Sequence, residues 1–243
     1  MVAARAQRAF TLAKEAGRTC EDFILGCRLH GRYAVSDGAS VSYDSRGWAR
    51  ALCRQFLADV NPPGTAWLRA ARDRFGAGAA APVDDWAAAH ATERGSFATF
   101  LGIAITGPQI VVHAIGDTVL FVITPDGELA MFPDLPPEAF RHDPALLCSR
   151  PGRSAFDDSD DAFAASVFTL PVPARGWAGT RLLAMTDALA EWVAGAAAAG
   201  ARRQRLDELA GLLDGEAFRL WAGAAIAAGQ VRRDDCALLT IRL

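Results

Sequence analysis

Lysine is nearly absent from this chain of 243 residues: Lys14 is the only one, so almost all of the cationic side chains are arginines. Cysteine is also sparse. Its five copies are an odd number without zinc-like spacing, which favours reduced, mostly buried thiols over disulfides or a zinc site. They are Cys20, Cys27, Cys53, Cys148 and Cys236.

Long apolar runs are absent too. The most apolar stretches, 98–106 and 192–201, are far shorter than the ~20 residues of a membrane span, and 10–13 is too short for the apolar core of a signal peptide. The net charge of −3 offers neither a nucleic-acid footprint nor a polybasic membrane patch. We therefore expect a soluble, cytoplasmic protein with no nucleic-acid or membrane partner.

Composition is that of a globular protein, with 51% hydrophobic and 22% charged residues. The length suits one substantial hydrophobic core, and the chain shows no internal repeat and no linker. We expect a single domain over 1–243.

Along the chain, short apolar runs that indicate strands are interspersed with segments whose apolar residues have helical spacing. Strands are expected at 10–16, 23–29, 32–36, 97–106, 109–115, 119–124, 128–132, 162–170, 181–186 and 237–242. Helices are expected at 44–59, 66–75, 82–94, 189–199, 205–213 and 216–228. The four runs within 97–132 are separated by turn residues and predict an antiparallel meander. The irregular stretch 133–161 is a candidate flap beside a site, with a plain surface loop as the default.

The most informative stretch is 32–40, in which an apolar strand runs into Asp37-Gly38. Asp and Gly are both unfavourable inside a strand, so the strand should end here with the carboxylate at the edge of the sheet. Gly38 also permits close approach of a ligand to its own carbonyl. Alone, Asp-Gly after an apolar run usually marks only a turn.

The same pattern recurs at three other apolar runs. Asp117 and Asp187 each follow one, Asp234-Asp235 precedes another, and Glu21-Asp22 opens the strand at 23–29. Carboxylates gathered by a folded sheet require cations to compensate their charge. Oxygen ligands favour Mg²⁺ or Mn²⁺ over zinc or copper, so the pattern predicts a hard-metal site.

The order of these motifs resembles the type 2C protein phosphatases, the metal-dependent serine/threonine phosphatases (PPM), in a divergent, bacterial-type form. The resemblance implies an α+β fold, a four-layer α-β-β-α sandwich of two antiparallel sheets flanked by helices. It also implies an enzyme that hydrolyses phosphoserine and phosphothreonine esters with two or three Mg²⁺ or Mn²⁺ ions. Its partners would be a phosphorylated protein substrate and a Ser/Thr kinase or the target of that kinase.

The resemblance assigns roles to particular residues. Asp37 would bridge two metal ions, and Gly38 would offer its carbonyl oxygen to one of them. Asp187 and Asp234 would ligate the other ion, and Glu21 would hold a metal-bound water. Two such ions acidify a shared water, which then attacks phosphorus in line. The catalytic set is therefore Asp37, Asp187 and Asp234.

Two further roles follow from the same resemblance. Asp117, assisted by Asp22, would support a third and weaker ion, although a simple turn residue is an equal interpretation of Asp117. The family's phosphate-binding arginine would fall at Gly17. Arg18, one residue later, is the substitute we expect to bind the substrate, against the alternative of an exposed surface arginine.

Other positions also depart from the family pattern. Many members carry Gly-Gly soon after Asp-Gly, where this chain has Ala39-Ser40-Val41-Ser42; Ala188 stands where Gly is usual, and Asp235 where Asn is common. None of these changes removes an expected direct metal ligand. The alternative function is a catalytically weakened phosphatase-like module that binds or scaffolds in a signalling pathway.

Overall fold

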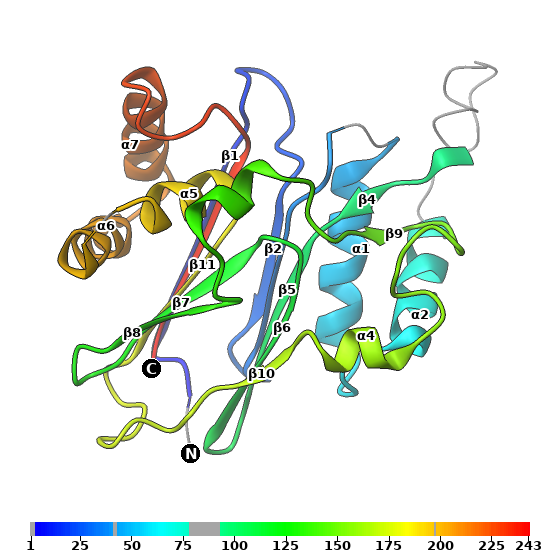
Figure 1. The fold of residues 1–243 in the computed structure, drawn as a ribbon, viewed down its shortest axis with the longest axis horizontal. Helices are drawn as coiled ribbons and strands as arrows, with labels where there is room; N and C mark the ends of the chain where they lie inside the picture. The colour runs from blue at the N-terminus through cyan, green and yellow to red at the C-terminus, as the bar shows by residue number, and fades with distance from the viewer. Residues whose placement is uncertain (1–2, 41–42, 78–92, 197) are drawn as a thin grey trace.

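The computed structural model describes residues 3–40, 43–77, 93–196 and 198–243, and two five-stranded antiparallel sheets dominate it (Figure 1). The first sheet has the order β1 (Ala6–Leu12), β12 (Cys236–Arg242), β11 (Arg181–Met185), β7 (Val119–Ile123) and β8 (Leu129–Phe132). The second has the order β10 (Val167–Thr169), β6 (Gln109–Ile115), β5 (Phe100–Thr106), β3 (Arg32–Ser36) and β2 (Phe23–Cys27). A short ladder pairs β4 (Phe97–Ala98) with β9 (Leu147–Cys148).

The two sheets face each other across an apolar layer. Alternate side chains of both sheets point into it, because neighbouring residues of a strand lie on opposite faces. Tyr33 and Leu101 from the second sheet, and Leu120 and Leu182 from the first, have no exposed surface. This layer holds the sheets together and fixes where their ends lie relative to each other.

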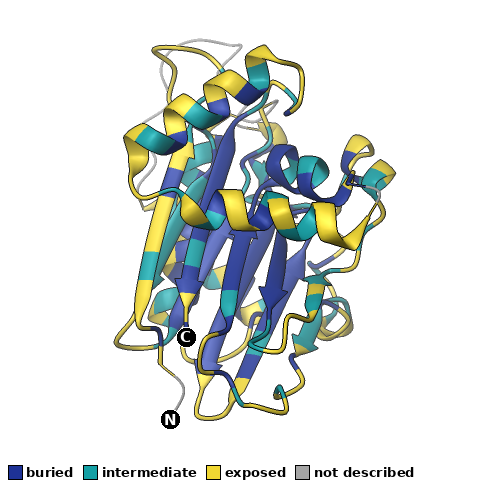
Figure 2. Cartoon of the chain, turned by 90° about the vertical axis from the view of Figure 1, so that its left-hand side faces the viewer, coloured by how far each residue is buried: buried dark blue, intermediate teal, exposed yellow. Residues whose placement is uncertain are grey.

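Helices cover the outer face of each sheet. Against the second sheet lie α1 (Ser45–Ala58), α2 (Thr65–Gly76) and α4 (Asp160–Ala164), and against the first lie α5 (Asp187–Ala194), α6 (Ala199–Gly211) and α7 (Gly215–Ala227). In α1, Trp48, Leu52 and Phe56 recur every four residues and form its buried face. Exposed residues line the outward sides of the helices while the strands behind them are buried (Figure 2). The expected four-layer α-β-β-α sandwich is confirmed.

Two predicted strands were placed wrongly. The strand expected at 162–170 begins as α4, and only Val167–Thr169 is extended, because Phe163 packs as a helical residue against Trp67 and Phe156. The strand expected at 10–16 ends at Leu12. Beyond it the backbone of Lys14 bonds to a side chain rather than to a neighbouring strand.

The expected meander is divided between the sheets. β5 pairs with β6 in the second sheet and β7 pairs with β8 in the first, so the chain crosses between sheets at Gly116-Asp117. The stretch 133–161 contains a 3₁₀ helix, η1 (Pro137–Arg141), which packs on α5, as well as β9. Most of the helix expected at 82–94 lies outside the described residues.

None of the helices in the described ranges has both the length and the apolar character needed to cross a membrane. The five cysteines are free thiols, and all except Cys27 are buried. That the whole chain forms one domain stays a prediction.

Candidate metal centre

Carboxylates from both sheets meet at one end of the sandwich. Asp37 follows β3 of the second sheet, Asp187 follows β11 of the first, and Asp117 lies in the link that joins the two sheets. Together with Asp234, which precedes β12, and with Gly38, they line a cavity of about 550 Å³. Strand ends far apart in the sequence therefore supply one cluster of acidic side chains.

Asp22 is the most buried carboxylate of this cluster, and Asp37 lies beside it. Asp22 is 1% exposed; its Oδ2 accepts a hydrogen bond of 2.9 Å from the Thr186 hydroxyl, whereas its Oδ1 has no hydrogen-bond partner. Burial raises the pKa of Asp22 and of Asp37 well above the ordinary value, and the neighbouring carboxylates raise both further. Such a pair needs a proton or a cation between its members.

Asp117 extends the cluster. It is 5% exposed, and burial together with the charge of Asp187 raises its pKa to about 7. Burial also raises the pKa of Asp187, although Arg232 partly offsets this. Several neighbouring carboxyl groups with pKa values shifted by burial and like charge are typical of a functional site.

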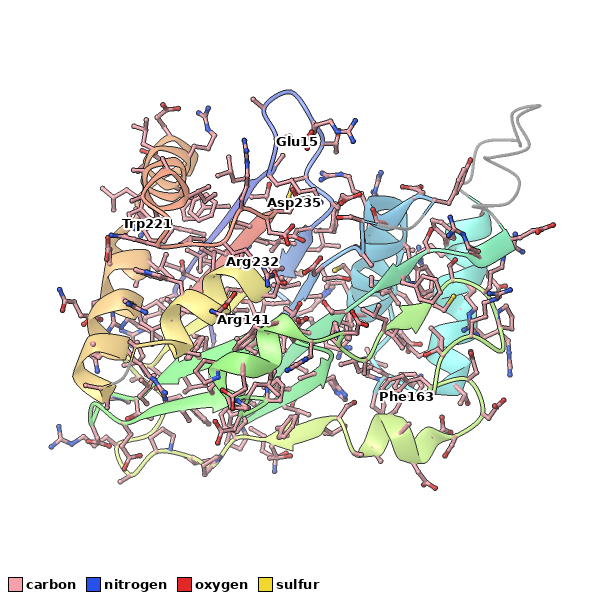
Figure 3. All side chains as sticks on the ribbon, turned by 45° about the horizontal axis from the view of Figure 1, so that its top comes forward. Glu15, Arg141, Phe163, Trp221, Arg232 and Asp235 are labelled. Carbon is pink, nitrogen blue, oxygen red and sulfur yellow. The ribbon has the colours of Figure 1, made fainter. Side chains whose placement is uncertain are left out.

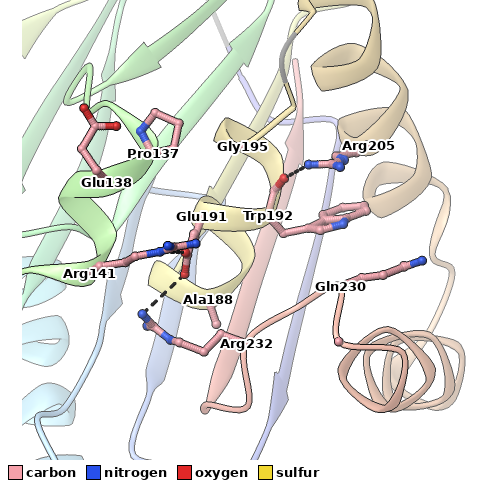
Figure 4. Close-up of a pocket in the computed structure, with 11 residues that line it drawn as sticks. Pro137, Glu138, Arg141, Ala188, Glu191, Trp192, Gly195, Arg205, Gln230 and Arg232 are labelled. Carbon is pink, nitrogen blue, oxygen red and sulfur yellow. Dashed lines mark hydrogen bonds and ion pairs between the residues drawn. The ribbon is translucent and has the colours of Figure 1, made fainter.

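Arg232 lies against the open side of the cluster. Its guanidinium is paired with Asp187 and lies 3.6 Å from Asp234 Oδ2. It also reaches Glu191 Oε2 at 3.5 Å, and Arg141 pairs with the other oxygen of Glu191 at 2.6 Å (Figure 4). Arg141 and Arg232 thereby separate the acidic cavity from an adjoining one of about 810 Å³ under α5 and η1.

Lys14 is the second basic side chain at the cluster. Its Nζ lies 3.2 Å from Glu21 Oε2 and 3.8 Å from Asp234 Oδ1, and it donates to the Ser40 hydroxyl. Glu21 also accepts hydrogen bonds from Ser40 at 2.6 Å and from Ser45 at 2.8 Å. Burial alone would raise the pKa of Glu21, but these hydrogen bonds and Lys14 bring it below its ordinary value.

Asp235 faces away from the cavity and holds the loop between β1 and β2. Its two carboxylate oxygens accept the backbone N–H groups of Lys14, at 2.7 Å, and of Glu21. Figure 3 shows Asp235 beneath this loop, on which Glu15 is labelled, with Arg232 nearby. The side chain is 5% exposed, so this anchor is shielded from water.

The donor set fits a hard divalent cation, but no formed coordination shell is present. Across 3–40, 43–77, 93–196 and 198–243, no three His, Cys, Asp or Glu side chains are arranged as a metal site. Asp187 and Asp234 instead face the guanidinium of Arg232. The buried oxygen of Asp22 that lacks a partner among the described residues nevertheless lies beside Asp37, where a cation could replace a proton, and oxygen donors are those preferred by Mg²⁺ and Mn²⁺.

Gly38 fits closely into this end of the molecule. A Cβ added there would lie 2.8 Å from the backbone and side chain of Ser45, so a larger residue would displace the start of α1. The backbone at 38 thus lies close to the acidic cavity without a side chain in the way.

The structure brings together the acidic residues expected at the site. Glu21, Asp22, Asp37, Asp117, Asp187 and Asp234 lie in one cluster, with Gly38 at its edge. Arg18 does not contact the carboxylate cluster: its side chain is 77% exposed and its Nε is 3.6 Å from Glu15. With Lys14, Glu21 and Ser40 it lines an adjoining cavity of about 420 Å³. Its substrate-binding role stays a prediction.

Lys14 and Arg232 were not expected at the site. Lys14 stands out in the sequence as the single lysine, seven residues before Glu21, and Arg232 lies two residues before Asp234. Neither spacing is a known ligand pattern, so only the fold shows that both side chains reach the carboxylates.

No family model matches the chain, and no curated protein shows significant sequence similarity to it. Several solved structures, however, are similar to it in fold. The serine/threonine phosphatase PstP/Ppp of Mycobacterium tuberculosis is 16% identical with a TM-score of 0.58, each chain being covered to 98%. The PPM phosphatase MsPP of Mycobacterium smegmatis, solved with cacodylate, is 18% identical with a TM-score of 0.54 over 100% of both chains.

A third similar structure is the catalytic domain of the phosphatase PstP in complex with two manganese ions. It is 15% identical with a TM-score of 0.57, covering 98% of this chain and 97% of that one. At these identities the likeness establishes the arrangement of the backbone. The chain has the fold of the PPM serine/threonine phosphatases.

Proposed function

We propose that this protein is a metal-dependent phosphatase that hydrolyses phosphoserine and phosphothreonine esters. The observation that carries the proposal is the buried Asp22 oxygen that has no hydrogen-bond partner among the described residues. It lies beside Asp37 within a cluster of carboxylates at the end of a PPM-type sandwich. Two or three Mg²⁺ or Mn²⁺ ions would be held by Asp37, Asp187 and Asp234 and by the Gly38 carbonyl. When bound, such ions supply positive charge that acidifies water and stabilises phosphoryl oxygens.

The chain's own groups prepare this site. Thr186 donates to Asp22 and in turn accepts the backbone N–H of Ala237 at 2.9 Å, which fixes the orientation of the Asp22 carboxylate. Ser40 and Ser45 hold Glu21 in its charged form, in which its oxygens can accept a hydrogen bond from water and orient it. Asp117 adds a further buried carboxylate for a weaker ion.

The test is hydrolysis of p-nitrophenyl phosphate and of a phosphothreonine peptide by purified protein with Mn²⁺ or Mg²⁺, and with a chelator. We expect turnover that needs the metal and falls by roughly a thousandfold or more in Asp37→Asn, since the ions contribute several kcal/mol to the barrier. Asp73→Asn, an exposed substitution on α2, is the matched control. No turnover by the wild type with either metal would overturn the proposal.

A second candidate is a phosphatase-like binding module. It is favoured by the ion pairs that Arg232 and Lys14 make with Asp187, Asp234 and Glu21, since these engage carboxylates that the enzyme would need for metal. Metal or phosphopeptide binding by calorimetry, without any turnover, would support this module.

The physiological substrate in this proposal is a phosphorylated protein, with a Ser/Thr kinase or its target as partner. The free thiols fit the proposed cytoplasmic location.

A further inference from the structure

We infer that Lys14 is the residue that binds the phosphoryl group in this protein, in place of the arginine that the family carries at the position of Gly17. This inference rests on the proposed function, and it names a side chain that the sequence pattern does not assign.

Position 17 contributes no side chain at all. Gly17 has a φ of +79°, a conformation that suits glycine, and it stands in the turn between Lys14 and Glu21. Arg18 follows, but its guanidinium is directed to Glu15 and is largely exposed. The loop therefore needs another cation if a phosphate dianion is to approach several carboxylates.

Lys14 meets that requirement by its position. Its ammonium contacts Glu21 and lies within 3.8 Å of Asp234, an acidic residue of the main cavity. Lys14 itself lines the neighbouring cavity, together with Arg18, and its hydroxyl partner Ser40 lines both cavities. Lys14 is thus at the boundary where a phosphate ester entering the cluster would pass.

The ammonium also has a donor to spare. A lysine carries three N–H donors, and the hydrogen bonds of Lys14 Nζ go to Glu21 and Ser40. Asp234 is beyond hydrogen-bond distance at 3.8 Å. The remaining N–H has no hydrogen bond to the residues that the structure describes and can donate to a phosphoryl oxygen.

Departures from the family pattern come together around Lys14. Asp235 stands where Asn is common, and its two oxygens accept the backbone N–H groups of Lys14 and Glu21. An asparagine has one acceptor oxygen and would hold one of these groups only. Ser40 supplies the hydroxyl between Lys14 and Glu21. Asp235 thus holds the backbone at position 14, and Ser40 holds the Lys14 ammonium beside Glu21.

The kinetic test compares Lys14→Met, Lys14→Arg and Arg18→Met, with Arg69→Met on the exposed side of α2 as the charge-matched control. A charged hydrogen bond to phosphate predicts that KM for p-nitrophenyl phosphate rises about tenfold or more in Lys14→Met. Lys14→Arg should recover part of the loss, because guanidinium also binds phosphate. A larger rise of KM in Arg18→Met than in Lys14→Met would overturn the inference.

A second readout does not depend on turnover. Because the chain has one lysine, protein labelled with [ε-¹³C]lysine gives a single lysine NMR signal. We expect inorganic phosphate, titrated in the presence of Mg²⁺, to shift this signal saturably, whereas sodium chloride of equal ionic strength should not. The shift should weaken in Asp235→Asn, where the loop loses one of its two anchors.

The two measurements separate the two proposals. A saturable shift in a protein without turnover would support Lys14 as a phosphate ligand while the proposed enzyme fails. If Lys14→Met turns over substrate with an unchanged KM, and phosphate does not shift the lysine NMR signal of the wild type, the inference is overturned. The proposed phosphatase activity is then still supported.

Discussion

Burial and the neighbouring Asp187 raise the pKa of Asp117 to about 7, far above the ~3.9 of a carboxyl group in an unfolded chain. Between these values the folded state binds the proton more tightly than the unfolded state does. Asp117 therefore favours folding at low pH, and this contribution is lost as the pH rises through 7. In the absence of metal, the stability of the protein should fall from pH 6 to pH 8 for this reason.

Asp117→Asn should remove this dependence. The single group accounts for about 1 kcal/mol of unfolding free energy between pH 6 and pH 8. Urea unfolding of wild type and variant in the presence of a chelator, at both pH values, measures the difference; carboxylates distant from Asp117 cancel in the comparison. An equal pH dependence in the two proteins would contradict the shifted pKa.

Arg232 competes for the oxygens of Asp187 and Asp234. Arg232→Met should therefore raise the affinity for Mg²⁺ or Mn²⁺, on the order of tenfold for one removed charge-assisted contact. Isothermal calorimetry measures the change. Arg141→Met is the control, because Arg141 pairs with Glu191 rather than with the cluster. A lower affinity in Arg232→Met would show instead that the arginine supports metal binding.

At the scale of elements, the link between β6 and β7 carries the chain from one sheet to the other. Gly116 there has a φ of +91°, and an added Cβ would lie 2.7 Å from the Thr99 side chain and 2.8 Å from the Ala145 carbonyl. Gly116→Ala should destabilise the protein by about 2–4 kcal/mol, through backbone strain and overpacking together.

Gly127 provides the matched comparison. Its φ is +87°, but an added Cβ would meet nothing within 4 Å. Gly127→Ala should therefore cost only about 1–2 kcal/mol, the penalty of the left-handed backbone itself. Chemical denaturation of both variants measures the two costs, and equal losses would rule out crowding at Gly116.

The link between β6 and β7 also shows which features of the fold the sequence predicts and which it does not. Turn residues such as Gly116-Asp117 mark where a strand ends, and this information is local. Whether the next strand returns to the same sheet depends on packing between distant strands, so the expected single meander was wrong. The acidic residues were predictable because each ends or opens an apolar strand.

Lys14 could not be assigned to the site in this way. Its backbone contact to Asp235 joins residues 221 positions apart, and only the pairing of β1 with β12 brings them together. Asp235 was noted as a departure from the family pattern, but only the folded structure shows that it holds the loop between β1 and β2.

At the scale of the whole molecule, negative charge accumulates at one end of the sandwich. Seven carboxylates lie in or beside the cluster, and Lys14 and Arg232 are the basic residues paired with them in the described ranges: Glu21, Asp22, Asp37, Asp117, Asp187, Asp234 and Asp235. A cation that binds here stabilises the folded state in proportion to its occupancy.

Mg²⁺ or Mn²⁺ should therefore raise the melting temperature. At a hundred times the dissociation constant the gain is about 2.7 kcal/mol, whereas sodium chloride of equal ionic strength should give far less. Differential scanning calorimetry with each salt makes the comparison. Equal effects of magnesium chloride and sodium chloride would point to general screening rather than a site.

The cluster draws Asp22 and Asp37 from one sheet and Asp187 and Asp234 from the other. The distance between these two pairs therefore depends on the thickness of the apolar layer between the sheets. Sheets packed face to face lie typically ~10 Å apart. Replacing Leu101 or Leu182 with a larger or smaller side chain would shift the two pairs of carboxylates relative to each other without changing any polar group. If the proposed metal ions bind here, their affinity should therefore respond to substitutions in the apolar layer between the sheets.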